Sequence, residues 1–432
     1  MGQIARAATI TALGMGFGRA LTIVREVVVA ATFGISGHMD AWAVAFTLVG
    51  VPGSIIMGAL QTALIPAYSR TSALGEKRRL LAAAVSVALL GMGTAAALLL
   101  GTSTWLLRLI RSDASPASIA QSAQLLWLLL PYYFFTALNL LGYGTLQAEK
   151  KFTANALTPI LTPLCVIGTL LAWPGKTSVD ALAIGFSIGA LAEFFGLGIV
   201  LHRIGFRLIA AASPGILFGS SGVARQAMWL IPGTIISSAM PVIEQTLASR
   251  LGEGANAALA YGQRIPMAVN SLAAAALGMA VLPFFSEVIG RAGPDALKEV
   301  LARQARRLGA LASVAALLLA VASPWIVRLL YERGAFDAHA SALVSMVQAA
   351  YFLQLPGMLV GMLYGRAGVA QGRARMFPVV SAFTVMYQAL TAWGLSSWLG
   401  LPGLGLAAAT ASILNAAVLV WFVSYRVPGT NQ

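Results

Sequence analysis

Long apolar runs separated by short polar connections dominate the chain. Runs such as 80–101 and 308–324 are continuous and do not alternate with period two, which excludes the strands of a transmembrane barrel. A helix of about 20 residues crosses a bilayer, and the length allows about 12 such spans with their connections. The pattern therefore predicts an all-α polytopic membrane protein. The expected spans lie near residues 5–33, 40–69, 78–101, 118–147, 152–173, 178–202, 223–249, 256–288, 308–331, 340–371, 376–398 and 404–425.

Composition supports lipid as the solvent of this chain. Of its 432 residues, 59% are hydrophobic and only 10% are charged, whereas soluble domains carry about 25% charged residues. The net charge of +14 would suggest nucleic acid in a soluble protein, but here the basic residues lie in the connections and are interpreted as topology signals. Cys165 is the only cysteine, so no internal disulfide is expected.

Basic residues also predict the orientation. If the N-terminus is inside, the inner connections carry about three times as many Lys and Arg residues as the outer ones. We therefore expect a multi-pass protein with both termini in the cytoplasm. The stretch 1–20 lacks a convincing signal-peptidase site and is interpreted as the start of the first span.

The two halves of the sequence resemble each other. The heptapeptide LIPAYSR at 64–70 recurs as VLPFFSE at 281–287, and LLLPYYF at 128–134 recurs as LQLPGML at 353–359. Six spans separate the copies, so both have the same orientation, as in a parallel repeat about an axis along the membrane normal.

This repeat predicts two six-helix lobes around a central cavity. We expect an N-terminal lobe at 1–205, a connection at 206–222 and a C-terminal lobe at 223–432. Two lobes that rock about such a connection favour a transporter. A purely structural protein that arose by duplication is the alternative.

Charged residues inside the spans are candidates for function, because each costs roughly 2.5–3.5 kcal/mol at bilayer depth. Arginine suits phosphate through its forked donors. The adjacent Arg25 and Glu26 point about 100° apart on a helix, so we expect Arg25 to stay available to an anionic substrate. An Arg25–Asp40 ion pair that only fixes packing is the alternative. The candidate substrate-binding residues are Arg19, Arg25, Glu26, Asp40 and Arg264.

A second candidate group concerns a coupling cation. Glu244 stands among apolar neighbours, where it could exchange a proton or help to hold Na⁺. Gln388 and Thr410 could supply neutral oxygens. Glu193 in the sixth span is interpreted mainly as a structural carboxylate.

No enzyme constellation is present in the sequence. It has no G-x-x-x-x-G-K-[ST] loop, no H-E-x-x-H motif and no histidine cluster for a metal. We expect no enzymatic activity and no cofactor apart from Na⁺ or H⁺ as a coupling ion. G-x-x-x-G spacings are interpreted as helix-packing sites.

Three stretches carry a family resemblance. GFGRALTIVREVVVAATFGISGHMDAWAVAF at 16–46, EQTLASRLGEGANAALAYGQR at 244–264 and LLYERGAFDAHAS at 329–341 resemble signatures of the MurJ/MviN family of flippases. The resemblance implies the multidrug/oligosaccharidyl-lipid/polysaccharide exporter superfamily. By motif position it places Arg19, Arg25, Asp40 and Arg264 at charged cavity positions, and Glu244 at an acidic position connected with cation coupling.

The resemblance implies a flippase that moves a polyprenyl-diphosphate-linked glycan precursor, foremost lipid II, from the inner to the outer leaflet. Typical members have fourteen spans, against twelve expected here, and carry charges in the second helix where the stretch 47–61 has none. These departures fit an exopolysaccharide repeat-unit flippase as an alternative. An H⁺- or Na⁺-coupled small-molecule antiporter and a scaffold of an envelope-synthesis complex are further hypotheses. The expected partners are the lipid-linked oligosaccharide, the bilayer and envelope-synthesis enzymes, but no nucleic acid.

Overall fold

In the computed structural model, the described residues are 2–69, 71–149, 151–173, 178–207, 232–371, 373 and 376–424, and every regular element among them is a helix. The all-α prediction is confirmed. The chain divides into two compact units, 1–228 with 333–336, and 229–332 with 337–432. The predicted connection 206–222 lies outside the described residues from 208 onward.

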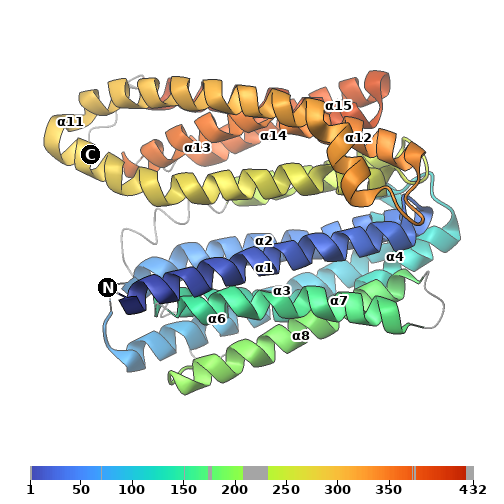
Figure 1. Cartoon of the computed structure of the whole chain (residues 1–432), viewed down its shortest axis with the longest axis horizontal. Coiled ribbons are helices and arrows are strands. Elements are labelled where there is room, and N and C mark those ends of the chain that lie inside the picture. Colours follow the sequence, from blue (N-terminus) through green and yellow to red (C-terminus); the bar gives the residue numbers. More distant parts are fainter. Residues whose placement is uncertain are drawn as a thin grey trace. The chain divides into compact units, whose positions relative to one another are not determined.

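The first unit is a bundle of helices that run in roughly the same direction or its reverse (Figure 1). Its core helices α2, α4, α5 and α8 pack on one another, and α1 packs against α6 and α7. The elements are α1 (Gly2–Phe33), α2 (Gly37–Ser69), α3 (Leu74–Ile110), α4 (Pro116–Leu128), α5 (Leu130–Ala148), α6 (Phe152–Leu157), the 3₁₀ turn η1 (Thr158–Ile160), α7 (Leu161–Ala172) and α8 (Val179–Arg203).

The second unit is built the same way. Its long helix α11 packs against α12 and α13, and α15 packs against α12, α13 and α14. The described elements are a helical segment at 232–238, α10 (Met240–Ser249), α11 (Ala255–Tyr331), α12 (Ala338–Phe352), α13 (Leu355–Ala370), α14 (Met376–Leu399) and α15 (Leu401–Ser424).

Among the described residues, eight helices are long and apolar enough to cross a membrane, or nine if α4 and α5 form one bent span. This finding confirms a polytopic membrane protein. The number twelve stays a prediction, although each expected span coincides with helix in the described part of the chain.

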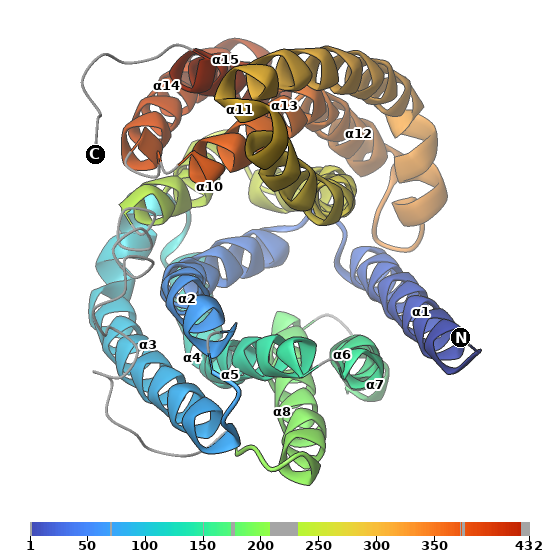
Figure 2. The ribbon, with the colours of Figure 1, turned by 90° about the vertical axis from the view of Figure 1, so that its left-hand side faces the viewer.

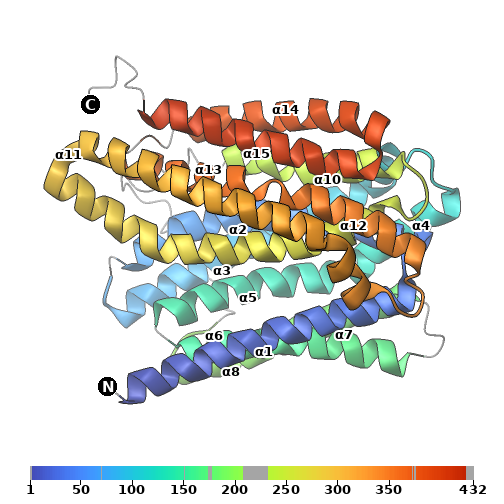
Figure 3. The same cartoon turned by 45° about the horizontal axis from the view of Figure 1, so that its top comes forward.

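The helix α11 differs from the sequence pattern. We expected two spans, 256–288 and 308–331, joined by a basic connection, but the backbone is helical from Ala255 to Tyr331. Figures 1 and 3 show this helix reversing direction, so its two arms correspond to the two expected spans. Within the expected connection, Arg303 pairs with Glu299 at 2.7 Å. Such i, i+4 pairs favour helix by a few tenths of a kcal/mol, in keeping with the helical backbone of this charged stretch.

Both units contain a helix broken at an equivalent proline. Pro131 follows the junction of α4 and α5, where the helix bends by 41°, and Pro356 follows the junction of α12 and α13. A proline leaves a backbone carbonyl unpaired in the preceding turn. The Ser187 hydroxyl donates to the Leu128 carbonyl at 2.8 Å. In the second unit the Ser412 hydroxyl donates at 3.0 Å to the Gln354 carbonyl, which also accepts the Met358 N–H at 3.0 Å.

Glycines at G-x-x-x-G spacing bring helix backbones together, as the sequence predicts. A Cβ added to Gly189 of α8 would lie 2.6 Å from the Cα of Thr162 in α7, so the two backbones are in close contact there. A Cβ added to Gly357 of α13 would lie 2.5 Å from the carbonyl carbon of Ser412 in α15. In lipid, such close contacts supply the dispersion energy that holds helices together.

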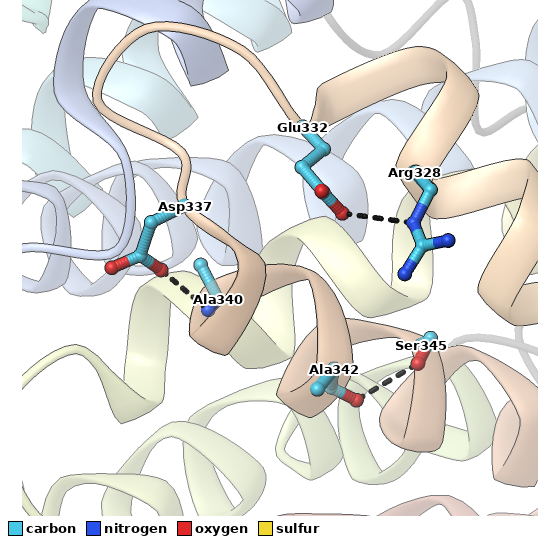
Figure 4. Close-up of polar contacts among 6 residues, drawn as sticks. All are labelled: Arg328, Glu332, Asp337, Ala340, Ala342 and Ser345. Carbon is cyan, nitrogen blue, oxygen red and sulfur yellow. Dashed lines mark hydrogen bonds and ion pairs between the residues drawn. The ribbon is translucent and has the colours of Figure 1, made fainter.

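The segment 333–336 belongs to the first unit by its contacts. The Ala335 backbone N–H donates to the carbonyl of Ala31 at 2.8 Å, and this approach requires glycine at Gly34 (φ 58°) and Gly334 (φ 61°). Figure 4 shows the flanking turn, where the Asp337 carboxylate accepts the Ala340 N–H at 2.7 Å and caps α12.

Candidate functional site

The first candidate cluster lies on α1. Arg25 and Glu26 are both buried, with 8% and 9% of their surfaces exposed. The Arg25 guanidinium donates from Nη2 to the Glu26 carboxylate in an ion pair. The prediction that these adjacent residues do not neutralise each other is wrong. The Cβ atoms diverge as expected, but the flexible stems of both side chains bend across that angle.

Arg25 nevertheless has N–H donors that form no described hydrogen bond. Its guanidinium lies 4.7 Å from the ring centroid of Phe186 on α8, in an arrangement that stabilises a desolvated cation. Its Nε is buried and has no hydrogen-bond partner within the described part of the chain. A buried donor without an acceptor is costly, so an anionic oxygen that reached the Arg25 guanidinium would gain a hydrogen bond there.

An aromatic cluster holds this part of α8 in place. Phe186 lies 5.4 Å from Trp42, 5.5 Å from Phe46 and 5.3 Å from Tyr132, measured between ring centroids. These rings come from α2, α5 and α8 and fix the face against which Arg25 packs. Aromatic residues of this kind are core residues by sequence pattern, and the sequence analysis did not link them to Arg25.

The other predicted residues of the first unit are in different surroundings. Asp40 lies in the first turn of α2, is buried, and forms interactions within the chain. A carboxylate there complements the N-terminal end of the helix dipole. Arg19 is exposed on α1, and no ion pair forms between it and the residues that the structure describes.

Glu193 of α8 is a structural carboxylate in its described contacts. It is buried, and its Oε2 accepts a hydrogen bond of 2.9 Å from the Tyr143 hydroxyl of α5. Asn139, one turn before Tyr143, donates to the Ala190 carbonyl at 2.9 Å. These two bonds join α5 to α8, which agrees with the structural interpretation of Glu193.

The second candidate cluster lies in the second unit around Glu244 of α10. Its Oε2 accepts from the Gln263 amide at 2.8 Å, and its Oε1 accepts from the Gln388 amide at 3.1 Å. The same Gln263 amide donates to the Tyr351 hydroxyl at 2.7 Å. Glu244, Gln263 and Tyr351 are all buried. The structure thus brings together Glu244 and Gln388, which are 144 residues apart.

Two predicted residues take no part in the described hydrogen bonds of this cluster. Thr410 is exposed on α15, and its hydroxyl donates to the Ala407 carbonyl of its own helix at 3.0 Å. Arg264 is half-buried on α11, directly after Gln263, and forms interactions within the chain.

Sequence analysis missed Gln263 and Tyr351. The sequence offered a signal for Gln263, because this residue directly precedes the candidate residue Arg264. Tyr351 gave no signal, because a lone tyrosine in an apolar helix is typical of a core residue. Only the packing of α12 against α11 places its hydroxyl in this cluster.

The donor set around Glu244 bears on which cation could bind. Both amides present N–H groups to the carboxylate, and N–H groups do not ligate a metal ion. Among the described residues, no group of three His, Cys, Asp or Glu side chains could hold a metal ion. In this arrangement the Glu244 carboxylate accepts a hydrogen bond from each amide.

Comparisons with known proteins agree with one another. The family model described as "Lipid II flippase MurJ" matches residues 29–432. A probable lipid II flippase MurJ from Synechocystis is 25% identical over 99% of this chain and 83% of its own length. The lipid II flippase MurJ of Burkholderia cenocepacia is 24% identical over 96% of this chain and 82% of its own length.

Solved structures share the fold. The structure of lipid II flippase MurJ in an inward closed conformation matches with a TM-score of 0.76 at 22% identity, covering 96% of this chain and 88% of its own. An inward-facing multidrug resistance MATE family transporter of the MOP superfamily matches with a TM-score of 0.78 at 13% identity, covering 97% of both chains.

Proposed function

Because this chain belongs to the lipid II flippase MurJ family, we propose that it translocates lipid II, a polyprenyl-diphosphate-linked glycan precursor, from the inner to the outer leaflet. The chain is a multi-pass protein of the bacterial inner membrane, and both termini lie in the cytoplasm. The two compact units are the lobes that alternate access, and the work is transport rather than covalent chemistry.

The observation that carries this proposal is the buried guanidinium of Arg25, of which only Nη2 forms a described hydrogen bond. A diphosphate presents several anionic oxygens, and a guanidinium binds them through parallel N–H donors. Glu26 accepts from Nη2 and Phe186 covers the face of the guanidinium, while no described hydrogen bond involves Nε or Nη1. The diphosphate binds the donors of Arg25 that Glu26 does not engage, while Glu26 and Phe186 hold the guanidinium in place.

Complementation of a conditional lipid II flippase depletion strain tests this function. The native chain should restore growth, and Arg25→Ala should not, at equal membrane levels. Arg108→Ala is the matched control, because Arg108 is an exposed arginine on α3 and its loss should leave rescue intact. Full rescue by Arg25→Ala would overturn the role of Arg25.

The cargo is tested in the same strain. Absence of rescue by the native chain, with the protein present in the membrane, would overturn lipid II as the cargo. In that case, secretion of polysaccharide by cells with and without the chain would test the exopolysaccharide repeat unit. Lipid II should bind the purified chain, and undiminished binding to Arg25→Ala would contradict the proposed contact.

We further propose that Glu244 couples transport to a cation, with H⁺ favoured over Na⁺ by the amide donors that face it. A buried carboxylate without an ion pair is a typical proton-exchange group in transporters, and the described residues form no ion pair with Glu244. Glu244→Gln should abolish the response of flipping in vesicles to an imposed pH gradient. Glu193→Gln, which removes a carboxylate bonded to Tyr143, should retain the response. A response that follows Na⁺ alone would refute proton coupling.

A further inference from the structure

A basic pocket lies at one end of the first unit, away from Arg25. Its volume is about 370 Å³, within the range of small-ligand pockets, about 300–1,000 Å³. The described residues that line it are Arg78, His202, Gly205 and Arg207. Figures 1 and 2 show the start of α3 and the end of α8, which supply these residues, at the same end of the unit.

The backbone at the end of α8 is shaped to admit Arg78. Gly205 has a φ of 87° and follows the last turn of α8, with its N–H bonded to the His202 carbonyl at 2.9 Å. A Cβ at position 205 would overlap the Nη2 atom of Arg78. Glycine at position 205 thus permits the left-handed turn and leaves room for the guanidinium of Arg78.

Aromatic and cation–π contacts fix the backbone beside the pocket. Phe206, directly after Gly205, is 1% exposed and stacks on Tyr68 of α2 with ring centroids 6.4 Å apart. The ammonium group of Lys77 lies over the ring of Tyr68, 5.0 Å from its centroid. These contacts fix the backbone on either side of the pocket, so the positions of Arg78 and His202 do not depend on a loose loop.

The acidic groups near the pocket are already engaged. Glu149 accepts from Lys77 at 2.8 Å and from the Tyr68 hydroxyl at 2.7 Å, and Glu76 accepts from the Thr71 hydroxyl. Within the described ranges, no carboxylate forms an ion pair with a side chain of the basic pocket. Two guanidinium groups and an imidazole therefore line one pocket without an ion-paired carboxylate from the part of the chain that the structure describes.

The helix dipole explains only part of this arrangement. Cations are stabilised near the C-terminal end of a helix, which accounts for His202 in the last turn of α8. Arg78 stands near the N-terminal end of α3, which begins at Leu74, and there the dipole gives a cation no support. Arg207 lies beyond α8. Their convergence calls for an anion from outside the chain.

We propose that the basic pocket binds the phosphate of an anionic phospholipid headgroup in the cytoplasmic leaflet. The bias of basic residues predicts that this end of the unit faces the cytoplasm, and the pocket lies where membrane-spanning helices end, at headgroup depth. Basic pockets at this level recognise phosphate headgroups through charge and forked hydrogen bonds. The site is separate from the proposed Arg25 site and does not rest on the proposed transport function.

Lipid binding to the purified full chain tests the proposal. In native mass spectrometry, phosphatidylglycerol should bind more tightly than phosphatidylcholine, which carries the same phosphate with a compensating cation. Arg78→Gln with Arg207→Gln should weaken phosphatidylglycerol binding about fivefold for each arginine removed. The control is Arg79→Gln with Arg203→Gln, two exposed arginines that do not line the pocket, and it should weaken binding less than the variant that loses Arg78 and Arg207.

Several outcomes would overturn the proposal. Equal losses in the two double variants would show that surface charge alone attracts the lipid. Equal affinity for phosphatidylglycerol and phosphatidylcholine would remove the anionic headgroup, and competition by millimolar inorganic phosphate would indicate a site for a free anion instead. If the double variant does not fold, Arg78→Gln is compared with Arg79→Gln, and equal binding by these two would equally contradict the proposal.

Discussion

Replacing Gly357 by alanine should destabilise the second unit, because this glycine lets α13 and α15 touch backbone to backbone. A Cβ at position 357 would lie 2.5 Å from the carbonyl carbon of Ser412 and 2.5 Å from the amide nitrogen of Ile413. Carbon atoms prefer separations of about 3.5–4.0 Å, so the two helices must move apart by about 1 Å. Overpacking of this kind costs about 1–3 kcal/mol.

The matched control is Gly394→Ala in α14. A Cβ at position 394 has no described heavy atom within 4 Å. Both substitutions gain the helix propensity of alanine over glycine, about 0.5–1 kcal/mol. That gain cancels when the two variants are compared, so the difference between Gly357→Ala and Gly394→Ala isolates the packing cost of about 1–3 kcal/mol.

Thermal unfolding of the purified protein in detergent measures this difference. Gly394→Ala should melt at or slightly above the native temperature, and Gly357→Ala should melt several degrees below it. Equal melting temperatures for the two variants would refute the backbone contact between α13 and α15 and with it the packing role of this G-x-x-x-G spacing.

Three further outcomes are expected. Ser187→Ala leaves the Leu128 carbonyl without its donor at the bend between α4 and α5, and the free energy of unfolding should fall by about 1–2 kcal/mol in chemical denaturation; no change would mean that water replaces the hydroxyl. Hydrogen bonding to Lys77 lowers the pKa of Glu149 below its ordinary value of 4.5, so its stabilisation is present above pH 4.5 and is lost as the pH falls through the lowered value. The melting temperature should drop in that window for the native chain but less for Glu149→Gln, and parallel curves would contradict this. Glu299→Gln removes an exposed pair and should cost less than about 0.5 kcal/mol, with the effect vanishing in high salt.

The sequence predicted the architecture well because the membrane imposes simple rules. Apolar runs of about 20 residues must be helices in lipid, since no other open segment satisfies its own backbone. Inside α11 the prediction was wrong only for residues 289–307, which were expected to form a connection and are helical. The repeat around Pro131 and Pro356 also has a structural counterpart, because the residue type itself interrupts a helix.

The candidate sites were less accessible to sequence reasoning, because polar contacts depend on side-chain reach and on distant helices. Helical periodicity placed Arg25 and Glu26 on different faces, yet flexible stems join them. The wheel gives only the direction of the Cβ atoms. Phe186 contacts Arg25 from 161 positions away, and no local pattern announces it.

The sequence by itself determined that this chain is a helical membrane protein of the MurJ family and that Glu244 stands out as a carboxylate among apolar neighbours. The tertiary structure alone decided that Gln263 and Gln388 donate to Glu244 and that Arg78 meets the end of α8 over Gly205. The physical reason is range. Burial in lipid acts on each helix independently and leaves a periodic trace, whereas a hydrogen bond acts over about 3 Å and exists only after helices distant in the chain have packed.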